Sequence, residues 1–557
     1  MGKQGKKIKK VSPKAAVAES ARTSEGSWLE KLENHFKNNN RAYLIISGIL
    51  LSIFTVLFFD PKVSIGGDDA EYINRSYEFL SKGVFPSFQG PLYPILISLL
   101  YAFTGLNIII FKLLSVVFNF VFVWYFYRLF KKHLPQHLSI ALLIIICTNA
   151  VILWYASSTY TETFFLMLQA IFLYYFDKFI ISNSAKDASK KQLLNYVLCA
   201  FLLFLLFITK NVGLAAFLAA TMYLLVSRKF KALLYLASFY IVFMAGFETA
   251  KRSVWKNDEV QISSQSNTLL NKHPYDKSMG REDAKGFVLR FVTNSNDYLS
   301  RHFLKIFGLR GENAKPVGLF TLIIYGLFFA GLVMALRKSP FWLFVGLYIG
   351  ISCAVVFIIL QTYWSQDRLI LVYTPLILAF ILYVSYQLFY IQLQKVWLYM
   401  LVVVLFFGGN LVKTLGQIPE NATALQHYLN GESLYGLTPD WVNFIKISMW
   451  ASKNLPKEAY VASRKPGISF IYGKGKEFHG IWNVPSEDPD ELYDILKKAG
   501  VTHIIVGSLR VNPDQKTDRV INTVHRYLSI IYNAYPDRLQ LIHKEGVDEQ
   551  AFLYELK

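Results

Sequence analysis

The chain has 557 residues, of which 54% are hydrophobic and only 17% are charged, and its formal net charge is +20. This composition supplies many of the roughly 20-residue apolar runs that a membrane-spanning helix needs, so it argues against a chain of soluble domains. The positive charge lies mainly at the ends of these runs, as the positive-inside rule predicts, and it does not indicate a nucleic-acid partner. The cysteines, Cys147, Cys199 and Cys353, lie inside apolar runs and form neither a disulfide framework nor a metal-ligand pattern.

The N-terminal segment, residues 1–41, is rich in lysine and lacks the apolar core of a cleavable signal, so we expect a basic cytoplasmic tail. The apolar run at 91–105 has about 15 residues, fewer than a spanning helix needs. If this run crossed the membrane, every later basic loop would lie outside, so we interpret it as a re-entrant or interfacial segment. About eleven transmembrane helices follow from this choice, at 42–59, 107–130, 138–156, 162–181, 193–210, 212–227, 232–248, 316–336, 341–361, 369–391 and 396–413.

The predicted helices form a polytopic membrane module at 42–415, with long outer loops at 60–106 and 249–315. In the tail at 416–557 the apolar density falls, and helical and strand-like patterns alternate, as in "PDELYDILKKAG" followed by "THIIVGS". This alternation predicts a small soluble α/β domain. Because the number of spans is odd, we expect the domain on the outer side of the membrane, opposite the N-terminus.

The stretch "GGDDAEYINRSY" (66–77) places two adjacent carboxylates, Asp68 and Asp69, at the membrane boundary. Apolar residues then recur at helical spacing, which predicts a short amphipathic helix on the membrane surface. Asp68 and Glu71 resemble a capping box, and an acid near a helix N-terminus is favoured by the helix dipole. One cap needs only one aspartate, so the second carboxylate carries a functional hypothesis.

Three more ionisable side chains fall at the outer ends of predicted spans. Glu162 lies in the apolar stretch "YTETFFLML", where an acid is costly unless it lines a cavity, finds a partner or reaches water from a loop. Lys210 ends the fifth span and Arg368 begins the tenth. Snorkelling would explain either cation alone, and Asp367 could pair locally with Arg368. Acids and bases on one outer face suit a phosphorylated lipid whose head group is held while a bond to it breaks.

The order of these motifs resembles that of integral-membrane glycosyltransferases of the GT-C superfamily, in the branch of protein O-mannosyltransferases and lipid A aminoarabinose transferases. A basic N-terminus and one span precede "DDAEY" (68–72), where the family more often has Asp-Glu. The stretches "YTETFFLML" (160–168) and "DRLILVYTPL" (367–376) resemble later elements, and "SRKP" (463–466) resembles the start of the family's outer domain. The resemblance covers most of the chain, but each motif is short.

The resemblance implies transfer of a single sugar from a polyprenyl-phosphate donor to a lipid, glycan or protein acceptor on the outer face, with inversion at the anomeric carbon. Asp68 is then expected to be the general base and must stay ionised, although Asp69 replaces the usual Glu and leaves open which aspartate is the base. Glu162 would position the acceptor or the sugar. Lys210 and Arg368 would stabilise charge on the departing phosphate.

The outer loop at 249–315 is a candidate to cover the bound substrate. Its spacing gives no ligand set, so we predict no metal site and no cofactor, with a divalent ion left open. The candidate substrate contacts are Tyr72, His273, Tyr275, Arg281 and His302.

Other functional classes stay open at this point. An oligosaccharide transferase or polymerase would share the fold, a transporter of lipid-linked sugars would want its acids inside the spans, and a non-catalytic relative would bind glycans through its tail domain. We expect an integral protein of the bacterial inner membrane with a periplasmic tail domain, because the tail carries neither disulfide-capable cysteines nor a retention signal.

Overall fold

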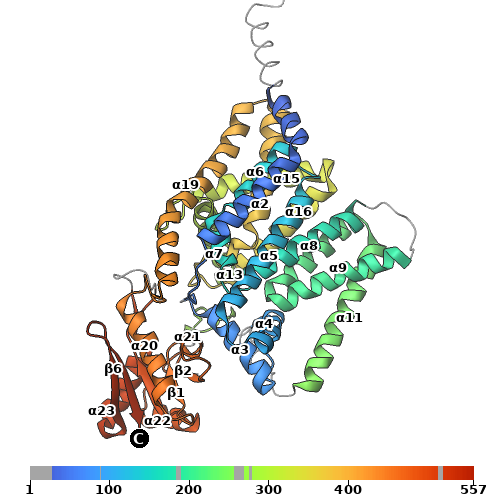
Figure 1. Ribbon diagram of the computed structural model, residues 1–557. Coiled ribbons are helices and arrows are strands. Elements are labelled where there is room, and N and C mark those ends of the chain that lie inside the picture. Colours follow the sequence, from blue (N-terminus) through green and yellow to red (C-terminus); the bar gives the residue numbers. More distant parts are fainter. Residues whose placement is uncertain are drawn as a thin grey trace, which may run out of the picture.

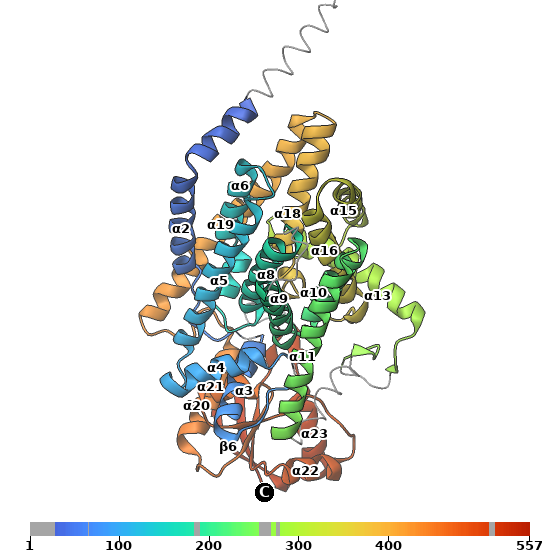
Figure 2. The same cartoon turned by 90° about the vertical axis from the view of Figure 1, so that its right-hand side faces the viewer.

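The computed structural model describes residues 28–64, 66–87, 89–182, 190–255, 269–274, 279–511 and 519–557. Its helices form a tall bundle. A domain that contains the strands lies at one end of this bundle, and helix α2 (Asn40–Leu57) begins at the opposite end (Figure 1). Two short helices, α3 (Asp68–Lys82) and α4 (Leu92–Thr104), lie at the end of the bundle next to this domain, as a view turned by 90° also shows (Figure 2).

The bundle consists of helices long and apolar enough to cross a membrane. The described residues contain nine such helical segments, and the pair α6 and α7, bent by 54°, gives a tenth. A shorter apolar helix, α10, coincides with the span predicted at 212–227, so each predicted span coincides with an apolar helix or helix pair. The helices are α2 (Asn40–Leu57), α5 (Ile108–Phe130), α6 (Gln136–Cys147), α7 (Ala150–Ala156), α8 (Glu162–Phe176), α9 (Lys190–Thr209), α10 (Leu214–Val226), α11 (Phe230–Val254), α15 (Gly318–Lys338), α16 (Pro340–Ile359), α18 (Thr374–Ser385) and α19 (Val396–Leu429).

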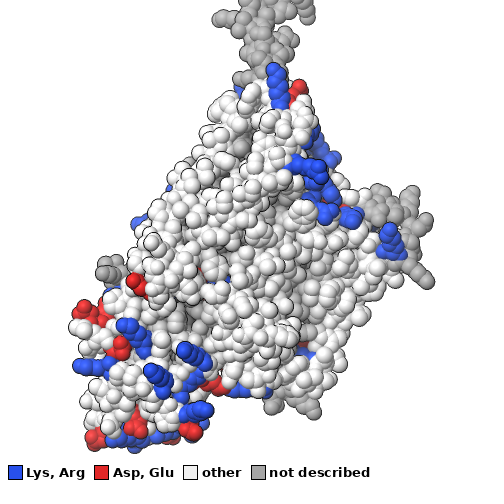
Figure 3. Space-filling view, viewed as in Figure 1, with Lys and Arg blue, Asp and Glu red and all other residues white. Residues whose placement is uncertain are grey.

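The surface of the bundle has the character of a membrane-embedded protein. Figure 3 shows a broad belt almost free of charged side chains, with lysines and arginines gathered towards the end where α2 begins and both signs of charge on the α/β domain. Large apolar side chains on this surface are exposed, for example Leu322 at 68% and Val412 at 73%. Such a continuous apolar surface would be unstable in water, so the chain is an integral membrane protein.

The apolar run at 91–105 forms helix α4, which has 13 residues. That is shorter than the roughly 20 residues of a full span, as the sequence predicts. Helix α4 packs against α3, whose ends are set by glycines in the left-handed conformation, Gly67 at φ 95° and Gly83 at φ 66°. Only glycine adopts this conformation readily, so the two glycines limit the helix to the stretch between them.

The second long outer segment contains α13 (Ala284–Asp297), the π-helical segment η4 (Tyr298–Phe303) and α14 (Leu304–Ile306). Helix α13 packs against α16 of the bundle, and η4 packs against the short helix α17 (Arg368–Leu371). This contact brings the outer loop beside the start of the tenth predicted span.

The C-terminal region is an α/β domain, as the alternating patterns predict. Its five-stranded sheet has the order β2-β1-β3-β7-β6, with β1 parallel to β2 and β3, and β7 antiparallel to β3 and β6. Helix α19 runs without a break through residue 415, so one helix connects the membrane bundle to this domain. The domain's elements are α20 (Pro439–Asn454), β1 (Val461–Ser463), α21 (Pro466–Tyr472), β2 (Phe478–Gly480), α22 (Pro489–Lys498), β3 (His503–Val506), β4 (Leu509–Arg510), β5 (Val520–Ile521), α23 (Thr523–Ala534), β6 (Leu539–Glu545) and β7 (Ala551–Leu556).

The α/β domain shares apolar contacts with the bundle. Side chains of α20 and α21, including Trp441 and Phe470, belong to the same buried cluster as the membrane helices. The ring of Phe470 lies 5.0 Å from the ring of Tyr77 on α3, measured between centroids. A second, separate cluster around Leu492 and Ile504 forms the domain's own core. Helix α3 is therefore held between the bundle and the domain.

Candidate active site

Asp68, the first residue of α3, forms an ion pair with Arg368, the first residue of α17 and 300 positions away in the chain. The carboxylate is 35% exposed and the guanidinium side chain is 20% exposed, so solvent reaches both. The guanidinium also lies over the ring of Tyr160, 5.4 Å from its centroid. Burial alone would raise the pKa of Asp68, but the charge of Arg368 outweighs it and holds the pKa below the ordinary value. Asp68 is therefore ionised at neutral pH.

Asp69 lies in a different environment, because its side chain is fully buried. Its Oδ2 accepts a hydrogen bond from the Ser64 backbone N–H at 2.9 Å, and its Oδ1 accepts one from the Ala70 N–H at 3.0 Å. Burial raises the pKa of Asp69 to about 7, although the ammonium of Lys112 and these two N–H groups act in the opposite direction. Both oxygens are thus used inside the protein, where they close the turn before α3.

The predicted capping box is not formed. The N-cap of α3 is Gly67, and among the described residues no side chain caps the helix. Glu71 instead accepts a hydrogen bond from the backbone N–H of Gly467, the second residue of α21, at 3.2 Å. A Cβ atom at position 467 would lie 2.7 Å from the Glu71 carboxylate, so glycine permits this approach. The capping prediction for Asp68 and Glu71 is therefore wrong, because the left-handed glycine begins the helix and the α/β domain binds the glutamate.

Glu162 and Lys210 form a second ion pair at the same end of the bundle. Glu162, the first residue of α8, is 1% exposed, and its Oε1 lies 2.8 Å from the Lys210 Nζ just after α9. The sequence left open whether Glu162 pairs with a cation or reaches water from a loop; in the structure it pairs with Lys210 and is buried from water. Gly90 allows this arrangement, because a Cβ atom there would lie 1.9 Å from the carbonyl oxygen of Thr209. The glycine of "GPLYP" thus lets this loop contact the end of α9 directly.

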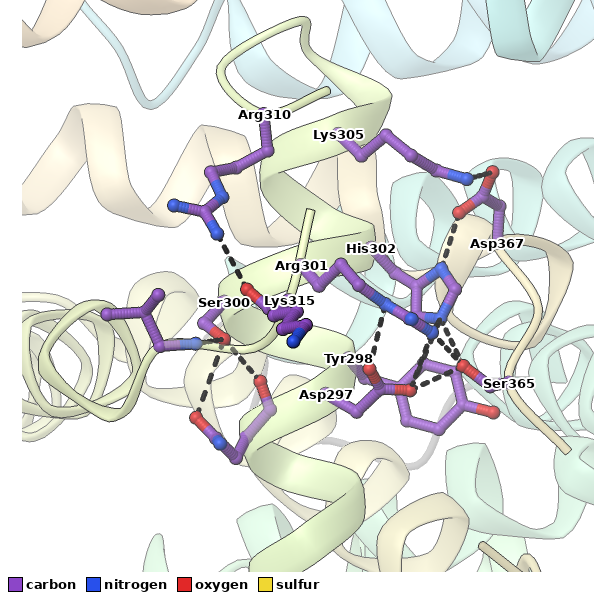
Figure 4. Close-up of polar contacts among 12 residues, drawn as sticks. Asp297, Tyr298, Ser300, Arg301, His302, Lys305, Arg310, Lys315, Ser365 and Asp367 are labelled. Atoms are coloured by element: carbon purple, nitrogen blue, oxygen red, sulfur yellow. Dashed lines mark hydrogen bonds and ion pairs between the residues drawn. The ribbon is translucent and has the colours of Figure 1, made fainter. Parts of the chain in front are cut away.

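Asp367 pairs with residues of the outer segment and not with its neighbour Arg368. Its Oδ1 lies 2.5 Å from the His302 Nδ1, and its Oδ2 lies 2.6 Å from the Lys305 Nζ (Figure 4). Together with Asp297, Arg301 and Ser365 these side chains form a network that we call the η4 cluster. Asp297 contacts Arg301 at 2.8 Å and His302 at 3.3 Å, and it accepts a hydrogen bond from the Ser365 hydroxyl at 2.6 Å.

Each aspartate of the η4 cluster is paired with basic side chains of the same cluster. Burial would lower the pKa of His302, but hydrogen bonds to Asp297 and Asp367 outweigh it and raise this pKa above the ordinary value. Burial would raise the pKa of Asp367, but its contacts with His302 and Lys305 lower it. The network fixes residues 365–367, and the next residue is Arg368. The network therefore fixes the backbone position from which the Arg368 side chain extends.

The remaining predicted substrate contacts take other positions. The Tyr72 hydroxyl donates a hydrogen bond to the Gln89 side chain, and its ring packs against Tyr93. The His273 ring packs against Tyr363, and the Arg281 backbone pairs with that of Asn271. Tyr275 lies outside the described residues. Among the described residues no group of three or more His, Cys, Asp and Glu side chains could hold a metal ion.

Two cations near Asp68 and Asp69 were not predicted as site residues. Lys112, buried in α5, donates hydrogen bonds to the backbone carbonyls of Asp60 and Lys62 and so fixes the loop before α3. Lys465, in the "SRKP" stretch of the α/β domain, extends to the backbone of Gly66, with 3.4 Å between its Nζ and the carbonyl oxygen. A lone lysine in either place gives no sequence signal of its own, because only the packing of distant elements brings it to α3.

A cavity of about 1080 Å³ lies beside these residues, between the end of α2, α7 and α19. Asp367 and Tyr155 contribute to its wall. Aromatic side chains, among them Trp154, alternate in the lining with carboxylates such as Glu312 and Glu420. The cavity has room for a small-molecule ligand, and its lining combines aromatic and polar groups.

Comparison with known proteins identifies the fold. No protein-family model matches this sequence, and a search of curated proteins gives no match. The structure is similar to that of apo ArnT from Cupriavidus metallidurans, with a TM-score of 0.51 and 12% identity over 93% of this chain and 98% of that chain. It is also similar to the oligosaccharyltransferase AglB from Archaeoglobus fulgidus, with a TM-score of 0.49 and 10% identity over 85% of this chain and 70% of that chain. The likeness to ArnT confirms the predicted GT-C fold.

Proposed function

We propose that the protein is a glycosyltransferase that moves a single sugar from a polyprenyl-phosphate donor to an acceptor at the outer face of the membrane. The observation that carries this proposal is the Asp68–Arg368 ion pair, which is accessible to solvent at the end of a GT-C bundle next to the α/β domain. It joins an ionised base to a cation that can bind phosphate, at the boundary where a lipid-linked donor would present its head group.

Asp68 is the general base in this mechanism. The acceptor's hydroxyl oxygen attacks the anomeric carbon from the side opposite the phosphate, and its proton passes to the Asp68 carboxylate. The bond between the anomeric carbon and the phosphate oxygen breaks, and the electron pair leaves with the polyprenyl phosphate, which inverts the anomeric carbon. Asp69 does not fit this role, because both of its oxygens already accept backbone hydrogen bonds and its side chain is fully buried.

The cations stabilise charge that grows on the phosphate as the bond breaks. Arg368 has five N–H donors, so it can hold Asp68 and still donate to a phosphate oxygen. Lys210 is held by Glu162 at 2.8 Å, which fixes the ammonium at the end of α9. Because these donors are in place before the reaction, no reorganisation is needed when the charge develops.

The cavity beside Asp367 supplies room for the acceptor's sugar or side chain. The proposed orientation places the N-terminus in the cytoplasm and the α/β domain outside, because basic residues gather towards the end of the bundle where α2 begins (Figure 3). A bacterial inner membrane with a periplasmic α/β domain is the proposed location.

The substitution Asp68→Asn tests the proposal. Cells that lack the protein should accumulate its lipid-linked donor, which mass spectrometry of lipid extracts detects, and the parental chain should clear it. We expect the variant to transfer sugar roughly 10²- to 10⁴-fold more slowly, which is the usual contribution of a general base. It should still bind undecaprenyl phosphate, the lipid with which ArnT has also been solved.

The outcomes separate the classes of function. Asp69→Asn, the matched control, keeps Asp68 and should retain most of the transfer activity. If Asp68→Asn cleared the donor at the parental rate, Asp68 would not be the base. Loss of the donor from extracts without any glycosylated acceptor in the parental strain would indicate a transporter instead.

A further inference from the structure

The two cations proposed to hold the donor phosphate are already paired with acids. Arg368 contacts Asp68, and Lys210 lies 2.8 Å from Glu162. A phosphodiester that enters this site adds negative charge, and that charge increases when the sugar departs. Because a buried charge is costly unless it is paired, a further cation that makes no ion pair of its own would strengthen the binding of this anion.

The α/β domain brings such a cation to the start of α3. Lys465 is only partly exposed, and a Cβ atom on Gly67 would lie 3.2 Å from its Nζ. Within the described residues it donates one hydrogen bond, to the Gly66 carbonyl, and this bond is long at 3.4 Å. It makes no ion pair with any carboxylate in the described part of the chain, so at least two of its three N–H donors are available.

The position of Lys465 is fixed by the packing of the domain. Its ammonium lies 5.9 Å from the centroid of the Trp441 ring, and Trp441 is fully buried. Two residues further along, the Gly467 N–H donates to Glu71 of α3. Apolar contact between Phe470 and Tyr77 continues this interface. The lysine is therefore held against the helix that carries Asp68.

We propose that Lys465 binds the phosphate of the polyprenyl-phosphate carrier beside Asp68, so that the α/β domain completes the donor site. This inference rests on the proposed function, because it takes the donor class from it. It gives the α/β domain a direct role in donor binding. It adds to Arg368 and Lys210, which share their charge with Asp68 and Glu162, a third cation that makes no ion pair in the described part of the chain.

The charged groups around Lys465 give this role a pH signature. Arg464 is its neighbour in sequence, and the facing acids on α3 are Asp68, Asp69 and Glu71. Burial and the charge of Arg464 lower the pKa of Lys465 to about 8, while the acids oppose this shift. The amine is thus charged below pH 8 and loses its proton above it. Affinity for phosphate should fall as the pH rises through this value.

Titration of the full-length protein in nanodiscs with undecaprenyl phosphate tests the inference. We compare the parental chain with Lys465→Met, Lys465→Arg and the control Lys498→Ala, whose lysine is 81% exposed on the same domain. At pH 7, Lys465→Met should bind roughly 10- to 100-fold more weakly, which is the usual value of a charge-assisted hydrogen bond, and the control should be unchanged. Undecaprenol, which lacks the phosphate, should bind all four chains equally.

The arginine variant makes the test independent of folding. Arginine stays charged at every accessible pH, so Lys465→Arg should bind the phosphate at pH 7 and should not lose affinity between pH 7 and pH 9, whereas the parental chain should. Equal binding by Lys465→Met and the parental chain would overturn the inference and leave the proposed function intact. A parental chain that did not distinguish undecaprenyl phosphate from undecaprenol would overturn the donor class itself.

Discussion

Two groups of acids and cations lie close together at the end of the bundle next to the α/β domain, and they differ in how completely they are paired. In the first, Asp68 is bound to Arg368 and remains 35% exposed. In the second, the η4 cluster, Asp297 and Asp367 each contact more than one partner, and the His302 side chain between them is only 4% exposed (Figure 4). The two groups meet at adjacent residues, Asp367 and Arg368.

The difference indicates which group can react. A carboxylate with one partner and access to solvent can accept a proton from an incoming molecule, because it has unused lone pairs. A network whose members are already paired with each other binds a substrate only by breaking its own contacts, so it is suited to holding a neighbouring residue in place. We infer that Asp68 reacts and that the η4 cluster positions Arg368 beside it.

Among variants that keep the proposed base Asp68, the largest effect is expected from Asp367→Asn, which weakens the contacts to His302 and Lys305 while leaving Arg368 in the sequence. Sugar transfer should fall roughly 10- to 100-fold through kcat, because a displaced guanidinium no longer orients Asp68. The affinity for undecaprenyl phosphate should fall by a smaller factor than kcat, because Arg368 is only one of the phosphate's donors and Lys210 and Lys465 are untouched. Steady-state kinetics and lipid titration measure the two quantities separately.

Glu312→Gln is the matched control for this prediction. Glu312 also contacts Lys305, at 3.0 Å, but it is 62% exposed and does not touch residues 365–367. The control should transfer sugar at close to the parental rate. If the two variants were equally slow, or if Asp367→Asn lost donor binding and kept kcat, the cluster would not act by positioning Arg368.

The fold could be predicted because its main signals are local. Long apolar runs mark where the helices lie, and the short run at 91–105 forms a helix of only 13 residues, as its length predicts. The positive-inside rule, together with the number of spans between these residues, also predicts that one end of the bundle carries Asp68, Glu162, Lys210 and Arg368. Long-range pairing had no such signal, since the Asp68–Arg368 contact joins residues 300 positions apart.

The incorrect and missing assignments have physical causes. The capping box at Asp68 and Glu71 is a local pattern, but the partner of Glu71 is Gly467 in another domain. Asp367 does not pair with its neighbour Arg368; it pairs with His302 in the π-helical segment and with Lys305 in α14, which directly follows that segment. Helix periodicity does not predict a π segment, because its register differs from that of an α-helix.

A smaller effect is expected at the contact between α21 and α3. In Gly467→Ala, the added Cβ would lie 2.7 Å from the Glu71 carboxylate and 3.1 Å from the Ala70 backbone, so the glutamate must move and lose its hydrogen bond. We expect transfer to fall a few-fold and donor affinity to fall with it, because Lys465 shifts together with α21. The loss of unfolding free energy should be about 1 kcal/mol.

Gly507→Ala serves as the comparison for this variant. Its Cβ would contact Phe444 at 3.5 Å, an ordinary packing distance inside the same domain. This variant should therefore behave like the parental chain in lipid titration and in transfer. Parental donor affinity in Gly467→Ala would show that the domain's fit against α3 does not set the position of Lys465.

The smallest effect on catalysis is expected from Asp69→Asn, which separates the two aspartates. The pKa of Asp69 is raised from 3.8 to about 7 in the folded protein, so between these values the folded chain holds a proton that the unfolded chain has released. The stability contributed by this group therefore falls as the pH rises through this window, by at most about 1.4 kcal/mol per pH unit. Thermal unfolding of the parental chain should show this decline between pH 5 and pH 7, and the decline should be smaller in the variant.

Asparagine at position 69 also has only one acceptor oxygen for the N–H groups of Ser64 and Ala70, so the variant should be less stable by about 1–3 kcal/mol at pH 5. Its transfer rate should stay within a few-fold of the parental rate wherever it is folded, because Asp68 and Arg368 remain. A folded Asp69→Asn protein as inactive as Asp68→Asn would reverse the assignment of the base. Retained transfer activity, together with a smaller decline of stability between pH 5 and pH 7, would show that the two adjacent carboxylates have different roles. Asp68 would accept the proton, and Asp69 would close the turn that holds Asp68 toward the substrate.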